Sequence, residues 1–224
     1  MTKSDKIIAI VPVRGGSKGL PGKNVRLLAG EPLYLRAVKQ ALRLADYCVI
    51  STDIPEILQV QAPERTQLLE RPPELAKDQT VMADVVADVI DRLNLKDETI
   101  LLLQATSPLR SDEDIRTVLR LHEKGDYDTA LTVTQTGSEV LKYGTLEGGE
   151  YCPLSDPLLC FDNRQNLPNV YRHNGAAYAF NAQMFRTSSG FPHAKIGAVV
   201  MPADRSHDID TQADFDAAAQ YLAS

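Results

Sequence analysis

The chain has 224 residues, 43% of them hydrophobic, and a net charge of −6 at pH 7. This length suits one sizeable α/β domain, or one domain with an insertion, and is short for two independent domains. The acidic balance argues against a nucleic-acid partner. The three cysteines are widely spaced and lack the C-x-x-C pattern, and no stretch approaches the roughly 18 apolar residues of a membrane span. We therefore expect a cytoplasmic protein with reduced thiols, no signal peptide and no membrane partner.

A glycine-rich basic loop follows the first predicted strand. Residues 7–13 form an apolar run typical of a buried parallel strand, and residues 14–24 contain four glycines beside Arg14, Lys18 and Lys23. Glycine lets the backbone approach an anion closely, and the cationic side chains neutralise phosphate charge. The loop predicts a phosphate-binding site, although a basic surface turn would show the same residues.

Two common phosphate-binding fingerprints do not fit this loop. A Walker loop needs a glycine five residues before the Gly22–Lys23 pair and a Ser or Thr after it, but the chain has Ser17 and Asn24 there. The dinucleotide pattern G-x-G-x-x-G is absent in every register. The loop therefore argues against a P-loop kinase and against a nicotinamide-dependent dehydrogenase.

The rest of the chain alternates predicted strands with predicted helices. Apolar runs predict strands at residues 47–52, 99–103, 130–133, 175–180 and 196–201. Helical periodicity predicts helices at 32–45, at 77–93, from Ser111 with Asp114 in a capping-box-like position, and near the C-terminus, where one face carries Phe215, Ala218, Ala219 and Leu222. This alternation predicts an α/β fold with a single doubly wound, mostly parallel sheet.

Residues 134–173 interrupt the alternation. They contain several glycines and prolines and show no long periodicity. We expect this segment to leave the core as an excursion with short strands.

Four polar clusters follow apolar runs, at residues 14–24, 51–53, 104–110 and 206–210. The carboxyl ends of parallel strands share one edge of the sheet, so these clusters are expected to meet at one cleft. Asp208 and Asp210 alternate across Ile209, which in an extended segment directs both carboxylates to the same side, as a Mg²⁺ site requires. Solvated or capping carboxylates remain an alternative.

Taken together, the motifs resemble the acylneuraminate cytidylyltransferase family, the CMP-sialic acid synthetases. The resemblance runs in order from residue 7 to about 215, and its motifs are the loop at 14–24, Arg-Pro-Pro-Glu-Leu-Ala at 71–76, Leu-Gln-Ala-Thr-Ser-Pro-Leu-Arg at 103–110, Asn-Gly-Ala at 174–176 and Asp-Ile-Asp-Thr at 208–211. It implies a Rossmann-like nucleotidyltransferase domain over residues 1–224, with a dimerisation element at about 134–173. A homodimer is therefore expected.

The resemblance also implies a reaction, in which CTP and a nine-carbon acylated 2-keto acid sugar give a CMP-sugar and pyrophosphate. The implied catalytic residues are Arg14, Lys18, Lys23, Asp208 and Asp210, of which Asp208 and Asp210 would hold Mg²⁺ or Mn²⁺. The implied nucleotide-binding residues are Arg14, Gly15, Ser17, Lys23, Asn24 and Arg71. The implied sugar-binding residues are Gln104, Asn174 and Tyr178, with Lys142 and Arg164 reaching the partner's site. Gln104 and Asn174 could instead cap strand ends, and Tyr178 could belong to the core.

The sequence departs from the family pattern at two places. Ala105 stands where many members have proline, and Val81 and Met82 stand where sialate-activating members often have serines. Lost hydroxyls change which sugar substituents a pocket can pair, so legionaminate or pseudaminate could replace N-acetylneuraminate. A further alternative is that the chain is a nucleotidyltransferase that acts on another sugar. Phe191 is expected to contact the acyl substituents or the dimer interface.

Overall fold

The computed structural model describes residues 6–223, which contain a seven-stranded sheet in the order β11-β7-β10-β6-β1-β4-β5. Its strands are β1 (Ile7–Val13), β4 (Tyr47–Thr52), β5 (Thr66–Glu70), β6 (Thr99–Leu103), β7 (Thr129–Thr136), β10 (Val170–Asn181) and β11 (Ile196–Val200). Among the described strands of this seven-stranded sheet, only β10 is antiparallel to its neighbours, β6 and β7. The predicted doubly wound, mostly parallel sheet is therefore confirmed. β5 and the reversed direction of β10 were not predicted from the sequence.

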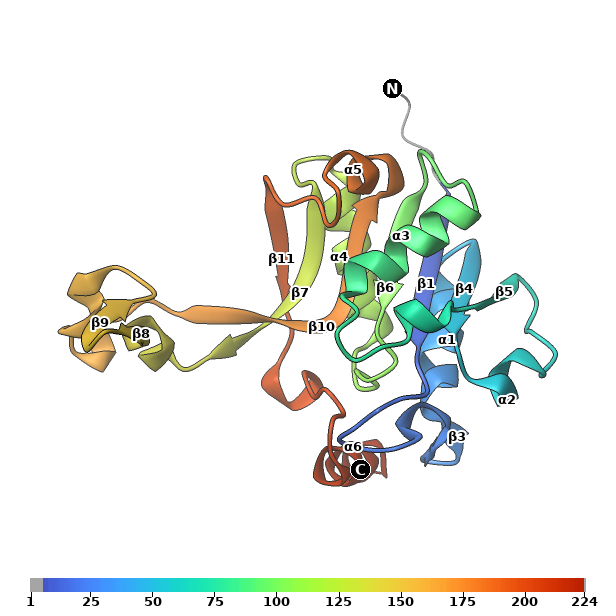
Figure 1. Ribbon diagram of the computed structural model, residues 1–224, viewed down its shortest axis with the longest axis horizontal. Coiled ribbons are helices and arrows are strands. Elements are labelled where there is room, and N and C mark those ends of the chain that lie inside the picture. The colour runs from blue at the N-terminus through green and yellow to red at the C-terminus, as the bar shows by residue number, and fades with distance from the viewer. Residues whose placement is uncertain (1–5, 224) are drawn as a thin grey trace.

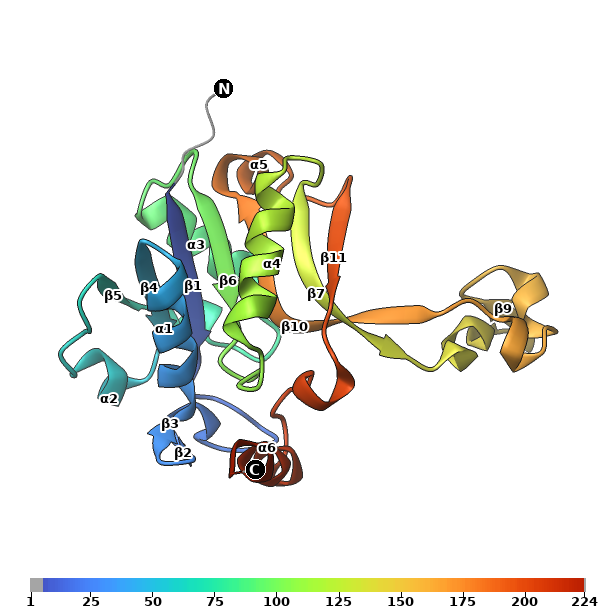
Figure 2. The same ribbon diagram turned by 180° about the vertical axis from the view of Figure 1, so that it is seen from behind.

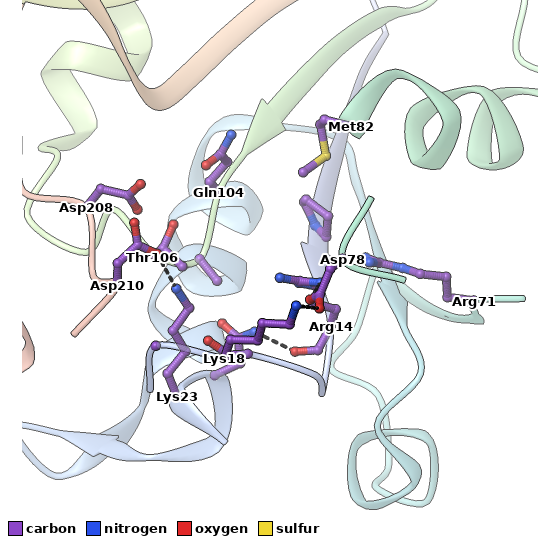
Figure 3. Close-up of a pocket in the computed structure, with 15 residues that line it drawn as sticks. Arg14, Lys18, Lys23, Arg71, Asp78, Met82, Gln104, Thr106, Asp208 and Asp210 are labelled. Atoms are coloured by element: carbon purple, nitrogen blue, oxygen red, sulfur yellow. Dashed lines mark hydrogen bonds and ion pairs between the residues drawn. The ribbon is translucent and has the colours of Figure 1, made fainter. Parts of the chain in front are cut away.

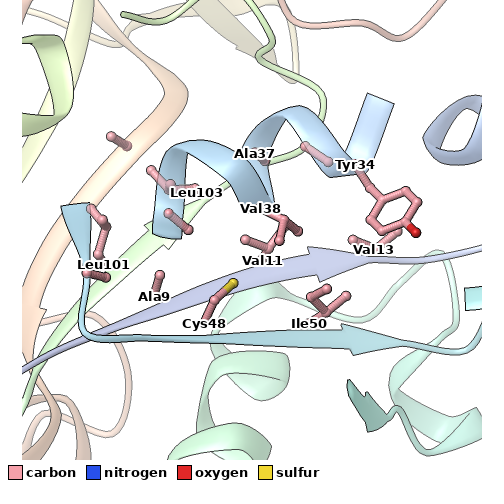
Figure 4. Packing of buried hydrophobic residues seen from close by; sticks show 14 of the residues in the cluster. Ala9, Val11, Val13, Tyr34, Ala37, Val38, Cys48, Ile50, Leu101 and Leu103 are labelled. Carbon is pink, nitrogen blue, oxygen red and sulfur yellow. The ribbon is translucent and has the colours of Figure 1, made fainter. Parts of the chain in front are cut away.

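Helices cover both faces of the sheet (Figures 1 and 2). Alternate residues of β1 point to opposite faces. Val11 belongs to the apolar cluster formed with α1 (Leu33–Leu44) and α4 (Asp112–Glu123). Ile10 belongs to the cluster formed with α3 (Met82–Arg92) and α5 (Ala182–Thr187) on the other face. Figure 4 shows the first of these clusters, with α1 lying across β1 and β4. The helices are α1 (Leu33–Leu44), α2 (Pro55–Leu58), α3 (Met82–Arg92), α4 (Asp112–Glu123), α5 (Ala182–Thr187) and α6 (Gln212–Ala223).

Two predicted helix starts can be compared with the structure. Ser111 and Asp114 form the predicted capping box of α4, with Asp114 N–H donating to Ser111 Oγ over 3.2 Å. The helix predicted at 77–93 begins only at Met82, because Val81 has an extended backbone and Thr80 N–H donates to the carbonyl of Lys77 in a turn. The residues before Met82 are thereby left in a loop at the edge of the sheet.

The predicted excursion is a long arm, residues 137–169, carried on the ends of β7 and β10 (Figure 1). Its tip contains a hairpin of β8 (Gly144–Glu147) and β9 (Glu150–Pro153), joined by Gly148 and Gly149, which both have positive φ. The arm also holds the 3₁₀ helices η3 (Ser138–Lys142), η4 (Pro157–Cys160) and η5 (Arg164–Asn166). Several of its large apolar side chains are exposed, such as Leu158 at 74% and Phe161 at 89%, whereas Leu167 is buried.

A third apolar cluster lies beyond the carboxyl ends of the parallel strands, next to α6. Phe215 and Ala218 of α6 pack there with Leu20 from the glycine-rich loop and with Ile209. The same region contains η1 (Lys23–Val25), β2 (Leu27–Leu28), β3 (Glu31–Pro32) and η6 (Ala203–Arg205), while η2 (Pro73–Leu75) follows β5. The cluster anchors the glycine-rich loop and the Asp208–Asp210 segment to one apolar support. Within residues 6–223, no helix has the length and apolar character needed to cross a membrane.

Candidate active site

A cleft of about 430 Å³ lies at the carboxyl ends of β1 and β6 (Figure 3). Three of the four predicted polar clusters line it, namely the glycine-rich loop, the 104–110 turn and the Asp208–Asp210 segment. The lining residues are Pro12, Arg14, Ser17, Lys18, Gly19, Lys23, Asn24, Arg71, Asp78, Met82, Gln104, Ala105, Thr106, Asp208 and Asp210. The sheet edge thus gathers residues that lie far apart in the sequence.

The fourth predicted cluster, residues 51–53, supports the cleft from outside its lining. Ser51 and Thr52 are fully buried. The Asp53 carboxylate accepts a hydrogen bond of 2.9 Å from the backbone N–H of Gly15. This N–H holds the loop in place, and Gly15 is absent from the lining residues. Residues 51–53 therefore meet the other clusters through Gly15 and Arg71, but they are not among the residues that line the cleft.

The glycine-rich loop contacts the Asp208–Asp210 segment directly. A Cβ placed on Gly19 would lie 2.3 Å from the carbonyl oxygen of Asp210, so only glycine permits this approach. Lys23, which is 8% exposed, donates from Nζ to the Ile209 carbonyl at 2.5 Å and to Asp210 Oδ1 at 2.9 Å. The predicted phosphate loop and the predicted metal carboxylates therefore form one unit.

The two carboxylates have different surroundings. Partial removal from water raises the pKa of Asp208, and the nearby charge of Asp210 adds to this rise, while a hydrogen bond from Thr106 opposes it. Asp210 is paired with Lys23. Both carboxylates line the same cleft, as the alternation across Ile209 predicts (Figure 3).

Oxygen donors of this kind fit a magnesium ion. Proteins usually bind Mg²⁺ through one or two carboxylates together with substrate phosphates. No group of three or more His, Cys, Asp or Glu residues within 6–223 could hold a metal by itself. Asp208 and Asp210 are thus suited to a metal ion whose remaining ligands come from a nucleotide and water.

Asp78 is a residue of the cleft that the sequence analysis missed. Its carboxylate accepts 2.8 Å from Arg14 Nη1 and 2.7 Å from Lys18 Nζ. The hydrogen bonds from Lys18 and Arg14 lower the pKa of Asp78. No spacing rule marks this residue, because its position depends on the fold of the loop before α3.

Arg71 and Gln104 reach the cleft from opposite walls. Arg71 is buried and donates from Nη2 to the Ser51 carbonyl at 2.8 Å, and its burial lowers its pKa. The backbone of Gln104 is held by Arg110, whose Nη1 donates to the Gln104 carbonyl at 2.6 Å and to the Ala176 carbonyl at 3.1 Å. Burial also lowers the pKa of Arg110, to about 9. Arg110 thus braces the turn from inside the protein.

Two residues predicted to bind sugar lie outside the lining of the cleft. Asn174 is buried, donates from Nδ2 to Ser206 Oγ at 3.0 Å and accepts from Thr132 Oγ1 at 2.6 Å. The hydroxyl of Tyr178 lies 3.2 Å from His173 Nδ1. Burial raises the pKa of Tyr178, and the charge of Asp208 contributes to the rise.

Three further predicted residues lie away from the cleft. Phe191 packs against Tyr178 and the aromatic rings of α5 and β10, with centroid distances of 5.3 to 5.8 Å. Lys142 and Arg164 lie in the arm, where Lys142 Nζ donates to the Asp162 carbonyl at 2.5 Å and Arg164 faces Glu139 at 3.9 Å. Within one chain, the arm extends away from the central sheet (Figure 1), and neither Lys142 nor Arg164 is among the residues that line the cleft.

Several solved structures share this fold. One, described as CMP:2-keto-3-deoxy-manno-octonic acid synthetase complexed with CTP, aligns over 98% of this chain and 99% of its own, with a TM-score of 0.73 and 18% identity. A 4-diphosphocytidyl-2C-methyl-D-erythritol synthase from Anaerococcus prevotii aligns over 98% of this chain and 96% of its own, with a TM-score of 0.63 and 15% identity. At these identities, the similarity establishes the shared fold.

Sequence relatives are more informative. An N-acylneuraminate cytidylyltransferase of Streptococcus agalactiae is 30% identical, and the match covers 94% of this chain and 52% of the relative. The chain therefore spans about half the length of this relative. A CMP-N,N'-diacetyllegionaminic acid synthase of Legionella pneumophila is also 30% identical, over 94% of this chain and 93% of the relative. These relatives confirm the resemblance that the motifs indicated. The cytidylyltransferase family model matches residues 8–195, and the chain belongs to this family.

Proposed function

We propose that the protein transfers CMP from CTP to a nine-carbon acylated 2-keto acid sugar and releases pyrophosphate. The observation that carries this proposal is the meeting of a cationic loop, the Gln104 turn and the Asp208–Asp210 pair in one cleft. The relatives named N-acylneuraminate cytidylyltransferase and CMP-N,N'-diacetyllegionaminic acid synthase support it. We therefore propose an N-acylneuraminate cytidylyltransferase activity, in which the acceptor is sialic acid or a closely related nine-carbon sugar.

The cationic side chains would bind and orient the triphosphate. Arg14 and Lys18 line the cleft together with Ser17 and Asn24, and Arg71 lies on the same side of the cleft as Arg14 (Figure 3). Negative charge that develops on the leaving pyrophosphate would be stabilised by Arg14, Lys18 and Lys23. Most of the rate enhancement would therefore come from positioning and charge neutralisation, as in other phosphoryl-type transfers.

Asp208 and Asp210 would hold Mg²⁺ or Mn²⁺ between the protein and the nucleotide. The ion would supply Lewis-acid polarisation at the α-phosphate. Lys23 would neutralise Asp210 before the metal arrives, since their side chains are 2.9 Å apart. The C2 hydroxyl of the sugar would attack the α-phosphorus with release of pyrophosphate, and Asp208 and Asp210 would help to deprotonate this hydroxyl.

The sugar would bind between Gln104 and Met82, which lie on facing sides of the cleft (Figure 3). Gln104 can donate and accept hydrogen bonds, whereas Met82 offers only apolar contact. An apolar side chain at this position favours an acylated substituent over a free hydroxyl. This observation keeps legionaminate and pseudaminate as alternatives to N-acetylneuraminate.

We also propose a cytoplasmic homodimer, with residues 1–224 acting as one cytidylyltransferase domain and the arm as its dimerisation element. The exposed apolar side chains of the arm support a partner surface. In the dimer, Lys142 and Arg164 would approach the partner's cleft and bind the acidic sugar there, while Asn174 and Tyr178 would support the sugar-binding wall. The three cysteines are free thiols, which is consistent with a reducing compartment.

A pyrophosphate-release assay tests the proposed reaction. The protein would be incubated with CTP, Mg²⁺ and either N-acetylneuraminate, legionaminate, pseudaminate or 3-deoxy-manno-octulosonate. We expect saturation kinetics with one of the first three sugars and a clear preference for CTP over ATP and GTP. Equal turnover of the three nucleotides, or turnover of 3-deoxy-manno-octulosonate alone, would contradict the proposal.

A further inference from the structure

The segment that carries Asp208 and Asp210 has no regular secondary structure. Residues 207–210 lie between η6 and α6 and form neither helix nor strand. Side-chain and loop contacts must therefore fix the two carboxylates. On the side of the cleft, Ile209 N–H donates to the Thr106 carbonyl at 2.8 Å, and Lys23 holds the Ile209 carbonyl.

A second set of contacts connects the chain just before this segment to α4, outside the lining of the cleft. Arg205 forms a two-pronged ion pair with Asp114, in which Nη1 binds Oδ2 and Nη2 lies 3.1 Å from Oδ1. The side chains of Arg205 and Asp114 are only 23% and 9% exposed. Planar paired hydrogen bonds of this kind fix orientation as well as distance.

Asp114 connects this ion pair to the wall of the cleft. Its carboxylate also accepts 2.7 Å from Ser111 N–H and 2.8 Å from Ser111 Oγ, in the capping box of α4. Ser111 directly follows the turn at residues 104–110, which lines the cleft with Gln104 and Thr106. Burial opposes ionisation of Asp114, but Arg205 and Ser111 outweigh it, and the pKa of Asp114 is lowered.

The residue after Arg205 has an anchor of its own. Ser206 Oγ donates to the Pro202 carbonyl at 2.9 Å and accepts from Asn174 Nδ2 at 3.0 Å. The segment is thus attached to β10 through Asn174 and to α4 through Arg205. These two attachments lie three or fewer residues from Asp208.

We propose that Arg205 is a positioning residue for the reaction, because its ion pair with Asp114 fixes the Asp208–Asp210 carboxylates relative to the Gln104 turn. This inference rests on the proposed function, in which these carboxylates hold the metal. Arg205 is not among the residues that line the cleft, so it would act through the backbone that it anchors. Loss of the ion pair would leave the two carboxylates present but poorly aligned.

The test compares Arg205→Met with a matched control, Arg43→Met. Arg43 also forms a two-pronged pair at the start of α4, with Nε 2.6 Å and Nη2 2.8 Å from Asp112. This second pair joins α1 to α4 and makes no contact with residues 206–210. Arg205→Lys and Asp114→Asn complete the set, since lysine keeps the charge without the paired geometry and asparagine removes the charge of the partner.

Binding of Mn²⁺ in the presence of CTP is followed by electron paramagnetic resonance, without the sugar. We expect the Mn²⁺ dissociation constant to rise about tenfold in Arg205→Met and in Asp114→Asn, as for other residues that orient metal ligands. Arg205→Lys should give an intermediate value. Arg43→Met should stay within about twofold of wild type even where its melting temperature falls, so a general loss of stability is separated from loss of alignment.

The proposal is overturned if folded Arg205→Met binds Mn²⁺ within about twofold of wild type. If Arg205→Met fails to fold, Arg205→Lys decides in the same way, with a wild-type dissociation constant overturning the proposal. A wild-type protein that binds no Mn²⁺ with CTP also overturns it. A wild-type protein that binds Mn²⁺ but turns over no keto acid sugar contradicts the proposed function alone.

Discussion

The cleft and the arm differ in how completely one chain builds them. In the cleft, Lys23 pairs with Asp210, and the adjacent Ile209 is buried in the apolar cluster that includes α6. In the arm, large apolar side chains such as Leu158 and Phe161 are exposed to solvent. One chain thus builds the frame of the cleft, whereas the exposed apolar side chains of the arm support the proposed partner surface.

The largest expected effect is the loss of turnover when a carboxylate of the cleft is removed. Asp210→Ala should lower turnover with CTP and Mg²⁺ about a thousandfold, because several kcal/mol of metal-dependent stabilisation would be lost. Pyrophosphate release at saturating substrate measures this. Asp204→Ala is the matched control, since Asp204 is an exposed carboxylate of the same segment outside the cleft. Undiminished turnover in Asp210→Ala would remove this residue from the metal site.

A second prediction concerns the contact between the loop and the carboxylate segment. Gly19→Ala should lower turnover about a hundredfold, because a Cβ would meet the Asp210 carbonyl at 2.3 Å and displace reacting groups. Gly16→Ala is the control, since a Cβ on Gly16 meets no atom within 4 Å. The two variants should differ in kcat more than in melting temperature. Equal kinetics of Gly16→Ala and Gly19→Ala would show that the close approach is irrelevant to activity.

The arm can be tested separately by its self-association. Phe161→Ser should weaken dimerisation about thirtyfold, as expected when an aromatic side chain central to an interface is lost. Sedimentation velocity over a range of protein concentrations measures the change. Val60→Ser is the control, because Val60 is an exposed apolar residue near α2, far from the arm. A wild-type protein that sediments as a monomer at all concentrations would refute the proposed role of the arm.

The buried strands of the sheet and the residues gathered at the cleft could largely be predicted from the sequence. Strands such as residues 99–103 are continuous apolar runs, so their burial follows from composition. The carboxyl-edge rule then placed Lys23 and Asp210 at one cleft before any contact was known. Local patterns and topology together were sufficient here.

Other features depend on tertiary contacts that sequence patterns do not carry. Asp78 reaches Arg14 because the chain before α3 folds as a loop, where helical periodicity had predicted helix. The ion pair of Asp114 and Arg205 joins residues 91 positions apart, and although Asp114 belongs to the predicted capping box, no motif marks Arg205 as its partner. Asn174 was identified from its motif, but only the structure shows that its polar atoms are bonded to Ser206 and Thr132.

The smallest expected effect concerns Asp78, which faces the same cations as the proposed triphosphate. Its carboxylate pairs with Arg14 and Lys18, so CTP must replace this carboxylate to reach either side chain. Asp78→Asn should therefore tighten CTP binding about two- to fivefold, the modest change expected for exposed ion pairs. Isothermal titration calorimetry without metal measures it. The gain should shrink as salt is raised, because salt screens exposed charges.

The pH dependence sharpens this prediction. The pKa of Asp78 lies below its ordinary value of 3.8, so the carboxylate stays ionised at pH 6 and at pH 8. The gain in Asp78→Asn should be the same at both values, and it should disappear only when acid protonates the wild-type carboxylate. Asp84→Asn serves as the control, since Asp84 lies on α3 outside the lining of the cleft. Weaker CTP binding in Asp78→Asn would contradict this prediction. It would mean that the Asp78 carboxylate orients Arg14 and Lys18 for the nucleotide, and that it does not compete with the triphosphate for them.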